Sequence, residues 1–230
     1  MPVALITGAS RGLGRATARA LAGRGWTLVA DARREEDLAR AVRGLPGVAA
    51  VPGDVTDPEH RARLAAEVSR AGRLDLLVNN ASRLGPSPQP LLREYPLAEL
   101  SRVYDTNVVA PLALFQLLAR PLTAAAGTVV NISSDAAVEQ YSGWGGYGSS
   151  KAALDQLTAI MAAEEPSLHC YAFDPGDMRT DMHQQAFPGE DISDRPEPDT
   201  VVPALLRLLD ERPPSGRYRA SDLAAPAVAR

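Results

Sequence analysis

Short apolar runs alternate with longer segments of helical periodicity along most of the chain. The apolar runs lie at residues 3–7, 27–31, 48–51, 74–80, 128–133 and 169–173, and a last short strand is expected near Arg217. The segments between them predict helices near residues 15–22, from Glu35, from about Pro58, across 98–118, over 147–163 and near 200–209. Strict alternation of strand and helix predicts a parallel sheet that helices cover on both faces.

Right-handed crossovers between successive parallel strands would give a doubly wound, Rossmann-like α/β architecture of about seven strands. The 230 residues fit one such domain, and a hydrophobic content of 45% suffices for its core. The sequence has no internal repeat and no Pro/Gly linker long enough to separate domains. We therefore predict a single domain over residues 1–230.

Three segments break the alternation: residues 83–96, which contain four prolines, residues 135–146, which end in GWGG, and residues 177–198. Each follows a predicted strand. They are therefore expected at the carboxyl edge of the sheet, where open α/β sheets bind their ligands. We predict that they build the substrate pocket and its lid.

Charge and composition exclude several classes of function. The net charge of -4 and a pI near 5.5 argue against a nucleic-acid surface, which needs a basic patch. Cys170 is the only cysteine and the three histidines are scattered, so we predict no internal disulfide and no metal site. The apolar stretch at 108–130 is interrupted by prolines and polar residues, and the first strand begins almost at Met1. We expect a cytoplasmic protein that neither spans a membrane nor carries a signal peptide.

The chain reads Thr7-Gly8-Ala9-Ser10-Arg11-Gly12-Leu13-Gly14 between the first predicted strand and helix. Gly8 permits a tight turn, while Gly12 and Gly14 let a pyrophosphate approach the backbone and the helix N-terminus. A glycine-rich turn alone is a weak signal, and a plain tight turn is the alternative. The position directly after the opening strand favours a dinucleotide site.

The end of the second strand bears on the choice of dinucleotide. A carboxylate there would hold the adenosine ribose of NAD, whereas arginine would accommodate the extra phosphate of NADP. Ala32 takes the discriminating position, Arg33 follows it, and Asp31 points to the opposite pleat if the strand is regular. Together with Arg11 this favours NADP(H). A shift of one residue would instead place Asp31 on the ribose and favour NAD(H).

Lys151 is the only lysine among 24 basic residues, and it lies four positions after Tyr147 in YGSSK. Four residues span about one helical turn, so the two side chains share a face and can meet. Lysine is a compact point charge, whereas arginine presents a broad planar fork. A phenol with an ordinary pKa near 10 is a poor acid-base catalyst at neutral pH, and a nearby cation favours its phenolate. We therefore expect Lys151 to lower the pKa of Tyr147. Chance placement of a lone lysine is the alternative.

The ordered motifs resemble the short-chain dehydrogenase/reductase family across nearly the whole chain. The turn at residues 7–14 matches the family's TGxxxGxG, Asp54-Val55 its adenine-side aspartate, Asn79-Asn80-Ala81 its NNA strand end, and Pro175-Gly176 with Thr180 its PG motif. Asn107, Ser134, Tyr147 and Lys151 fall on its catalytic tetrad. Ser134 lies 13 residues before Tyr147, and this spacing selects it over Ser133.

The resemblance implies a cofactor site on the glycine turn, the following strand ends and the PG motif. Its expected residues are Gly8, Ser10, Arg11, Gly12, Leu13, Gly14, Arg33, Asp54, Val55, Asn80, Ala81, Tyr147, Lys151, Pro175, Gly176, Met178 and Thr180. Asp54 is expected to contact adenine, with capping of the helix near Pro58 as the alternative. Tyr141, Trp144 and Met182 are expected to line an apolar substrate site, although loop packing explains them equally well.

The family chemistry implies that Tyr147 gives a proton to a carbonyl oxygen while NADPH delivers hydride to its carbon. Ser134 would stabilise charge on that oxygen, and Lys151 would also bind the nicotinamide ribose. Asn107 would bend its helix and hold a water that connects Lys151 to solvent. The prediction is an NADP(H)-preferring oxidoreductase for a small carbonyl or alcohol substrate, assembled as a homodimer or homotetramer.

Two alternatives stay open. The first is a catalytically silent NAD(P)-binding regulatory protein on the same fold, which would be expected to lose members of the tetrad. The second is an elimination or epimerisation enzyme, which would more naturally show a damaged glycine turn. This chain keeps all four members of the tetrad and an intact glycine turn. Its C-terminal GRYRASDLA differs from the glycine-rich ending common in the family.

Overall fold

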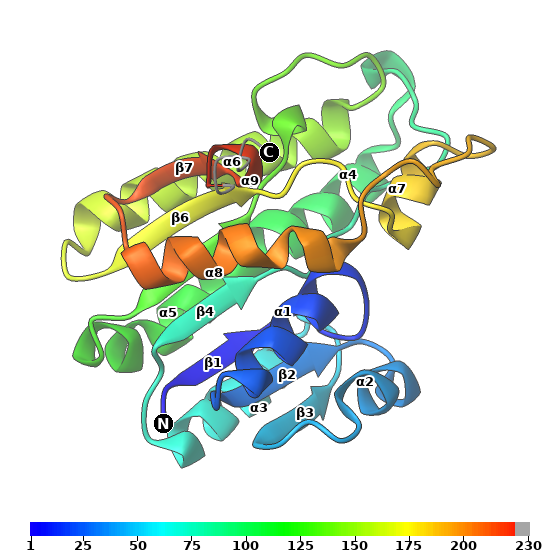
Figure 1. Ribbon diagram of the computed structural model, residues 1–230. Coiled ribbons are helices and arrows are strands. Elements are labelled where there is room, and N and C mark those ends of the chain that lie inside the picture. The colour runs from blue at the N-terminus through cyan, green and yellow to red at the C-terminus, as the bar shows by residue number, and fades with distance from the viewer. Residues whose placement is uncertain (224–230) are drawn as a thin grey trace, which may run out of the picture.

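The computed structural model describes residues 1–223, which form a doubly wound α/β fold around one parallel sheet (Figure 1). The strands are β1 (Val3–Ile6), β2 (Thr27–Ala32), β3 (Val48–Pro52), β4 (Leu76–Asn79), β5 (Thr128–Ile132), β6 (His169–Asp174) and β7 (Gly216–Arg219). Their order in the sheet is β3-β2-β1-β4-β5-β6-β7, and every neighbouring pair is parallel. The fold class and the strand expected near Arg217 are confirmed.

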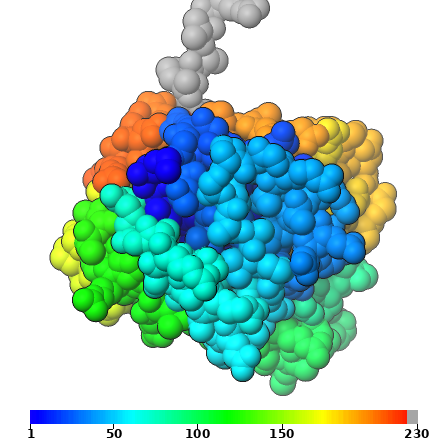
Figure 2. All heavy atoms as spheres, turned by 90° about the horizontal axis from the view of Figure 1, so that it is seen from below, coloured from blue at the N-terminus to red at the C-terminus, as the bar shows by residue number. Residues whose placement is uncertain are grey.

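Helices cover both faces of the sheet. Those that contribute buried residues to the first face are α1 (Gly12–Gly23), α2 (Glu35–Val42), α8 (Val202–Glu211) and α9 (Ala220–Leu223). The second face is covered by α3 (Pro58–Ala71), α5 (Ala110–Ala124) and α6 (Gly145–Glu164). In Figure 1, α1 and α8 lie in front of the strands and α5 lies behind them. Seen from below in Figure 2, segments of the N-terminal third, blue to cyan, cover much of the β3 side.

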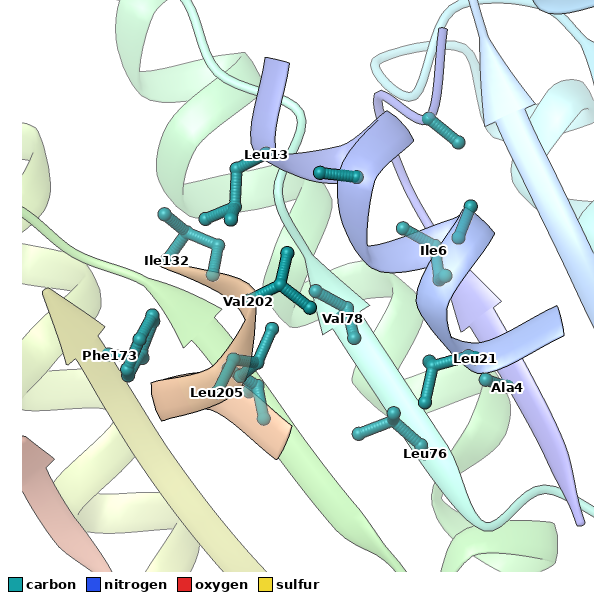
Figure 3. Close-up of a cluster of buried hydrophobic side chains, with 14 of the residues drawn as sticks. Ala4, Ile6, Leu13, Leu21, Leu76, Val78, Ile132, Phe173, Val202 and Leu205 are labelled. Atoms are coloured by element: carbon teal, nitrogen blue, oxygen red, sulfur yellow. The ribbon is translucent and has the colours of Figure 1, made fainter. Parts of the chain in front are cut away.

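The core divides into two layers because successive strand residues point to opposite faces. On β1, Ala4 and Ile6 pack in one layer and Val3 and Leu5 in the other. Figure 3 shows the first layer, in which Leu205 of α8 lies among side chains of the central strands. Since both faces are covered, the strands read as continuous apolar runs, which is the pattern seen in the sequence.

The helix expected from Pro58 begins at that residue for a local reason. Asp57 is the N-cap and its carboxylate accepts a hydrogen bond from the backbone N–H of Glu59 at 2.9 Å. Pro58 follows in the first turn, where its missing N–H costs no helical bond. Gly72 ends the helix with φ of 79° in the left-handed region.

The helix predicted over residues 98–118 is longer and interrupted. The structure has α4 (Leu97–Tyr104), a π-helical turn (Asp105–Val109) and then α5. The run Leu97–Ala124 is long and apolar enough to cross a membrane by length and composition, since an 18-residue window in it has a mean hydropathy of 1.2. That is weak evidence for a span, because helices that cover a sheet meet the same test, and α5 packs Leu114, Leu118 and Leu122 into the core.

The three irregular segments lie at the carboxyl edge of the sheet as predicted, since each follows a parallel strand (Figure 1). They hold more regular structure than expected. Short 3₁₀ helices occupy Leu92–Glu94 and Asp135–Ala137, and α6 already begins at Gly145. The segment at 177–198 contains α7 (Asp181–Ala186), whose N-terminus is capped by the Thr180 hydroxyl.

We expect Leu205→Ala to lower the free energy of unfolding by about 2–5 kcal/mol, because it opens a cavity in the first core layer. Leu205 is fully buried there. The matched control is Leu97→Ala on α4, whose side chain is 76% exposed and which should change the free energy of unfolding by less than about 0.5 kcal/mol. Urea unfolding followed by circular dichroism measures both. Equal destabilisation by the two variants would contradict this account of the core.

Candidate active site

The glycine turn is held tightly against the end of β4. Gly8 has φ of 67°, and a Cβ on Gly14 would lie 2.4 Å from the carbonyl oxygen of Gly8 and 2.5 Å from Asn80 Nδ2. The Asn80 amide donates to the carbonyl oxygens of Thr7 at 2.9 Å and of Gly8 at 3.2 Å. Glycine is therefore required at position 14 for the helix start, the turn and β4 to meet.

The end of β2 turns Asp31 inward. Its Oδ1 lies 2.6 Å from Nε2 of His60, its Oδ2 accepts from the backbone N–H of Gly8 at 3.4 Å, and both side chains are almost fully buried. Burial raises the pKa of the Asp31 carboxyl, and the hydrogen bond from His60 opposes this. The carboxylate thus contacts the glycine turn, and Asp31 borders the cavity together with Ala32 and Arg33.

Asp54 also borders this cavity, where its Oδ1 accepts hydrogen bonds from the backbone N–H and the hydroxyl of Thr56 at 2.9 and 2.8 Å. Burial acts to raise the pKa of Asp54, but these hydrogen bonds outweigh it and the pKa is lowered. Asp54 does not cap the following helix, because Asp57 holds that position. The capping alternative is therefore wrong, and the carboxylate stays ionised beside the cavity.

Tyr147 and Lys151 share one face of α6 beside the end of β5. The Lys151 ammonium lies 5.5 Å from the centre of the Tyr147 ring and donates a hydrogen bond to the carbonyl oxygen of Ile132 at 2.7 Å. Only 2% of Lys151 is exposed. The lone lysine is therefore a buried cation beneath a phenol.

The pKa values of this pair differ from the sequence expectation. Burial raises the pKa of the Tyr147 phenol to about 12, while interactions with Ser82 and Ser134 act to lower it. Burial also lowers the pKa of Lys151 to about 8, and the nearby Asp155 carboxylate opposes that shift. The phenol is thus protonated at neutral pH, because loss of solvent outweighs the attraction that was expected from the ammonium. A protonated phenol is the form that can donate a proton.

Ser134 follows β5 and borders the same cavity. Its hydroxyl donates to Asp135 Oδ1 at 2.9 Å and accepts from the backbone N–H of Ala136 at 3.2 Å. The interaction of Ser134 with the Tyr147 phenol agrees with the choice of Ser134 over Ser133. No sequence motif indicated that Asp135 would accept a hydrogen bond from this hydroxyl.

Asn107 lies in the π-helical turn that interrupts its helix, and the expected bend stays a prediction. Its Oδ1 accepts from the backbone N–H of Arg83 at 2.8 Å and from the Ser82 hydroxyl at 3.2 Å. Its Nδ2 donates to the Arg83 carbonyl oxygen and to Ser150 Oγ, each at 2.9 Å. Asn107 therefore fastens the segment after β4 to α6. The water that it was expected to hold stays a prediction.

The segment after β6 forms the opposite wall. Gly176 has φ of 71° and its backbone N–H donates to Asp174 Oδ1 at 3.0 Å. Thr180 Oγ1 accepts from the backbone N–H of His183 at 3.1 Å, which fixes the start of α7. Its methyl group would lie 3.6 Å from a Cβ on Gly12, so this segment closely approaches the glycine turn.

These walls enclose a cavity of about 1060 Å³ that runs from the glycine turn to Tyr147. The predicted residues that line it are Gly8, Ser10, Arg11, Gly12, Leu13, Arg33, Asp54, Val55, Asn80, Ala81, Ser134, Trp144, Tyr147, Lys151, Pro175, Gly176, Met178, Thr180 and Met182. Gly14, Asn107 and Tyr141 are not on its surface. The first two instead support residues that are.

An apolar cluster lies beside Tyr147 at one end of the cavity. Trp144 meets the Tyr147 ring edge to face at 5.9 Å between centres, and Met182 packs against the same cluster. Tyr141 lies on the outer side of Trp144, about half exposed, and its hydroxyl donates to Asp135 Oδ2 at 3.0 Å. Tyr141 therefore does not line the substrate site as expected, and loop packing, the alternative, explains its position.

Within residues 1–223, no group of three or more His, Cys, Asp or Glu side chains is arranged to hold a metal ion. Sequence reasoning missed two charged groups next to the cavity, the Asp31–His60 pair and the contacts of Arg217 with Asp155 and Asp174. Both join segments far apart in the chain, so no local motif could have indicated them.

Comparison with known proteins gives a consistent result. The family model described as short chain dehydrogenase matches residues 2–191. The chain is 37% identical over 201 residues to sepiapterin reductase from Rattus norvegicus, covering 80% of this chain and 77% of that protein. It is 34% identical over 222 residues to L-xylulose reductase from Homo sapiens, covering 90% and 88%.

Solved structures agree in fold. A short-chain dehydrogenase from Pseudomonas syringae superposes with a TM-score of 0.89 at 31% identity, covering 95% of this chain and 94% of that one. A short-chain dehydrogenase from Shigella flexneri, solved in complex with NADP, gives a TM-score of 0.87 at 29% identity and covers 96% and 97%.

The buried ammonium can be tested without a substrate, because Lys151 is the only lysine in the chain. We expect protein labelled with carbon-13 lysine to show one side-chain signal that titrates near pH 8, since burial disfavours the charged form. Nuclear magnetic resonance measures the midpoint directly. Asp155→Asn should lower it further, because the Asp155 carboxylate holds it up. A wild-type midpoint near the ordinary value of about 10.4 would contradict the buried site.

Proposed function

The chain belongs to the short-chain dehydrogenase family, and we propose that it is an NADP(H)-preferring oxidoreductase that interconverts a carbonyl and an alcohol. The observation that carries this proposal is the buried pair of Tyr147 and Lys151, which faces a cavity that begins at a dinucleotide-type glycine turn. The identity of about 35% to two named reductases supports the reductive direction.

The residues around the cavity fit a dinucleotide. The turn at Gly8 and Gly12 leaves backbone open to a pyrophosphate, because side chains are absent where the backbone takes positive φ. Asp54 and Val55 would contact the adenine, and Pro175 and Gly176 would flank the nicotinamide. When bound, NADPH supplies the hydride. The protein supplies orientation and the proton.

The phenol of Tyr147 would give its proton to the carbonyl oxygen, which needs the protonated form that burial favours. Ser134 would hydrogen-bond the same oxygen and stabilise the charge that develops there. For this, its hydroxyl must turn from Asp135 toward the substrate. Lys151 would hold a positive charge beneath the phenol as the proton leaves.

The proposed preference for NADP rests on the charges at the end of β2. The carboxylate of Asp31 borders the cavity but is buried and paired with His60, and we propose that this pairing keeps it from binding a ribose. Arg11 and Arg33 both border the cavity, where they would meet the extra phosphate. The NADP in the Shigella flexneri structure supports the same cofactor class.

We propose a substrate class narrower than carbonyl compounds in general. The apolar cluster at one end of the cavity, with Trp144 and Met182 against Tyr147, favours a small molecule that places an apolar or planar part beside the reacting carbon. We also propose a cytoplasmic homodimer or homotetramer. Exposed apolar side chains along α4, the π-helical turn and α5, namely Leu97, Val109 and Leu117, support association between copies.

A silent dinucleotide-binding regulator is the second candidate, and one substitution separates the two. We expect Tyr147→Phe to lower kcat for NADPH-dependent carbonyl reduction by about 10²–10⁴-fold, because the proton donor is lost. The measurement is NADPH absorbance with a panel of aldehydes and ketones. Tyr104→Phe, the same change in a tyrosine that does not line the cavity, should keep wild-type rates. Normal turnover by Tyr147→Phe would exclude the mechanism, and binding of NADPH without any turnover would favour the regulator.

For the cofactor, we expect Arg33→Ala to weaken NADPH binding by about 10–100-fold and to leave NADH binding nearly unchanged, because only NADPH carries the phosphate that the guanidinium would bind. Titration calorimetry on wild type and variant gives both dissociation constants. Arg70→Ala, another exposed arginine remote from the cavity, is the control. If the ratio of the two constants stays the same in Arg33→Ala, the phosphate assignment is wrong.

A further inference from the structure

The guanidinium of Arg217 bridges three segments that carry the reaction centre. From β7, its Nε donates to Asp155 Oδ2 at 3.1 Å, and its Nη2 donates to Asp174 Oδ2 at 2.8 Å and to the Ser134 carbonyl oxygen at 3.0 Å. These partners lie on α6, at the end of β6 and directly after β5. We propose that Arg217 is a positioning residue that holds these three segments in register for the reaction.

Each partner of Arg217 adjoins a working part of the site. Asp155 follows Lys151 by four residues on α6, so it lies on the same face one turn later. Asp174 uses its other oxygen to accept from the backbone N–H of Gly176 at 3.0 Å, in the turn proposed to flank the nicotinamide. Ser134 is itself proposed to contact the substrate oxygen. Displacement of Arg217 would therefore shift the cavity wall at three points.

The contacts are well protected from water. The side chains of Arg217, Asp155 and Asp174 are 23%, 15% and 4% exposed. Arginine suits this place because its planar fork can meet several oxygen acceptors at once, which a lysine ammonium does less well. Removal of the guanidinium would leave two carboxylates largely buried with a missing partner, which is costly for the folded arrangement.

The same three charges act on the catalytic pair. The Asp174 carboxylate acts to raise the pKa of Tyr147, and the Asp155 carboxylate acts to raise the pKa of Lys151. Burial raises the pKa of Asp155, and the Arg217 cation opposes this shift. The same cation partly cancels the field of both carboxylates at the reaction centre. Besides Asp174 and the Lys151 ammonium, the Asp135 carboxylate faces Tyr147, and none of the three Arg217 hydrogen bonds goes to Asp135.

The experiment compares Arg217→Gln with Arg219→Gln in the full chain. Arg219 lies two residues further along β7, and its guanidinium is 4.0 Å from Glu139 in an exposed pair, so its loss serves as a matched control. In carbon-13 lysine-labelled protein, we expect Arg217→Gln to raise the titration midpoint of the single Lys151 signal by about 1 pH unit, because Asp155 is no longer offset. Arg219→Gln should leave the midpoint at the wild-type value.

The kinetic part of the inference rests on the proposed function. We expect Arg217→Gln to lower kcat by about 10–100-fold with little change in KM for NADPH, since small misplacements of reacting groups are costly while the cofactor wall stays intact. If the wild-type protein shows no NADPH turnover, the proposed function is wrong. The lysine titration would then still test the role of Arg217.

A double substitution separates positioning from loss of folding. Arg217→Gln with Asp155→Asn removes the charge together with one of its partners, so the Lys151 midpoint should return toward the wild-type value. If Arg217→Gln does not fold, Asp155→Asn alone should lower the midpoint while Arg217 keeps Asp174 and Ser134. An unchanged midpoint in folded Arg217→Gln, or a kcat loss no larger than that of Arg219→Gln, would overturn the proposal.

Discussion

The burial of the Lys151 ammonium is the constraint on which the reaction centre depends. A charge removed from water is stable only where it is hydrogen-bonded and near opposite charge, and Lys151 has the Ile132 carbonyl oxygen and the Asp155 carboxylate. These partners come from the end of β5 and from the next turn of α6. The packing of α6 against the carboxyl ends of the strands therefore sets both the position and the pKa of the cation.

At both ends of the cavity, largely buried carboxylates are paired with groups from distant segments. At the glycine turn, the buried Asp31 meets His60 and the backbone of Gly8. On the opposite side, Asp155 and Asp174 share the guanidinium of Arg217. In each case a largely buried carboxylate joins a strand end to a distant segment. Such contacts are sensitive to geometry, because an unpaired buried charge is costly, and they hold the loops of the site in one arrangement.

The expected placement of Tyr147 beside Lys151 agrees with the structure, but the expected direction of the pKa shift of Tyr147 does not. Spacing placed Tyr147 and Lys151 on one helix face, and the structure shows them there. The expected lowering of the Tyr147 pKa does not occur, because the phenol is buried and the Asp135 and Asp174 carboxylates add to the effect of burial. Spacing along a helix describes one neighbour, whereas a pKa depends on solvent and on every charge nearby.

The sequence by itself determined the fold class, the glycine turn and the helix that carries Tyr147 and Lys151. These follow from periodicity and from steric rules that act over a few residues. Tertiary structure alone decided that Asp31 faces His60 and that Arg217 reaches Ser134, 83 positions away in the chain. Those outcomes depend on which distant side chains share a buried volume, and no local pattern encodes that.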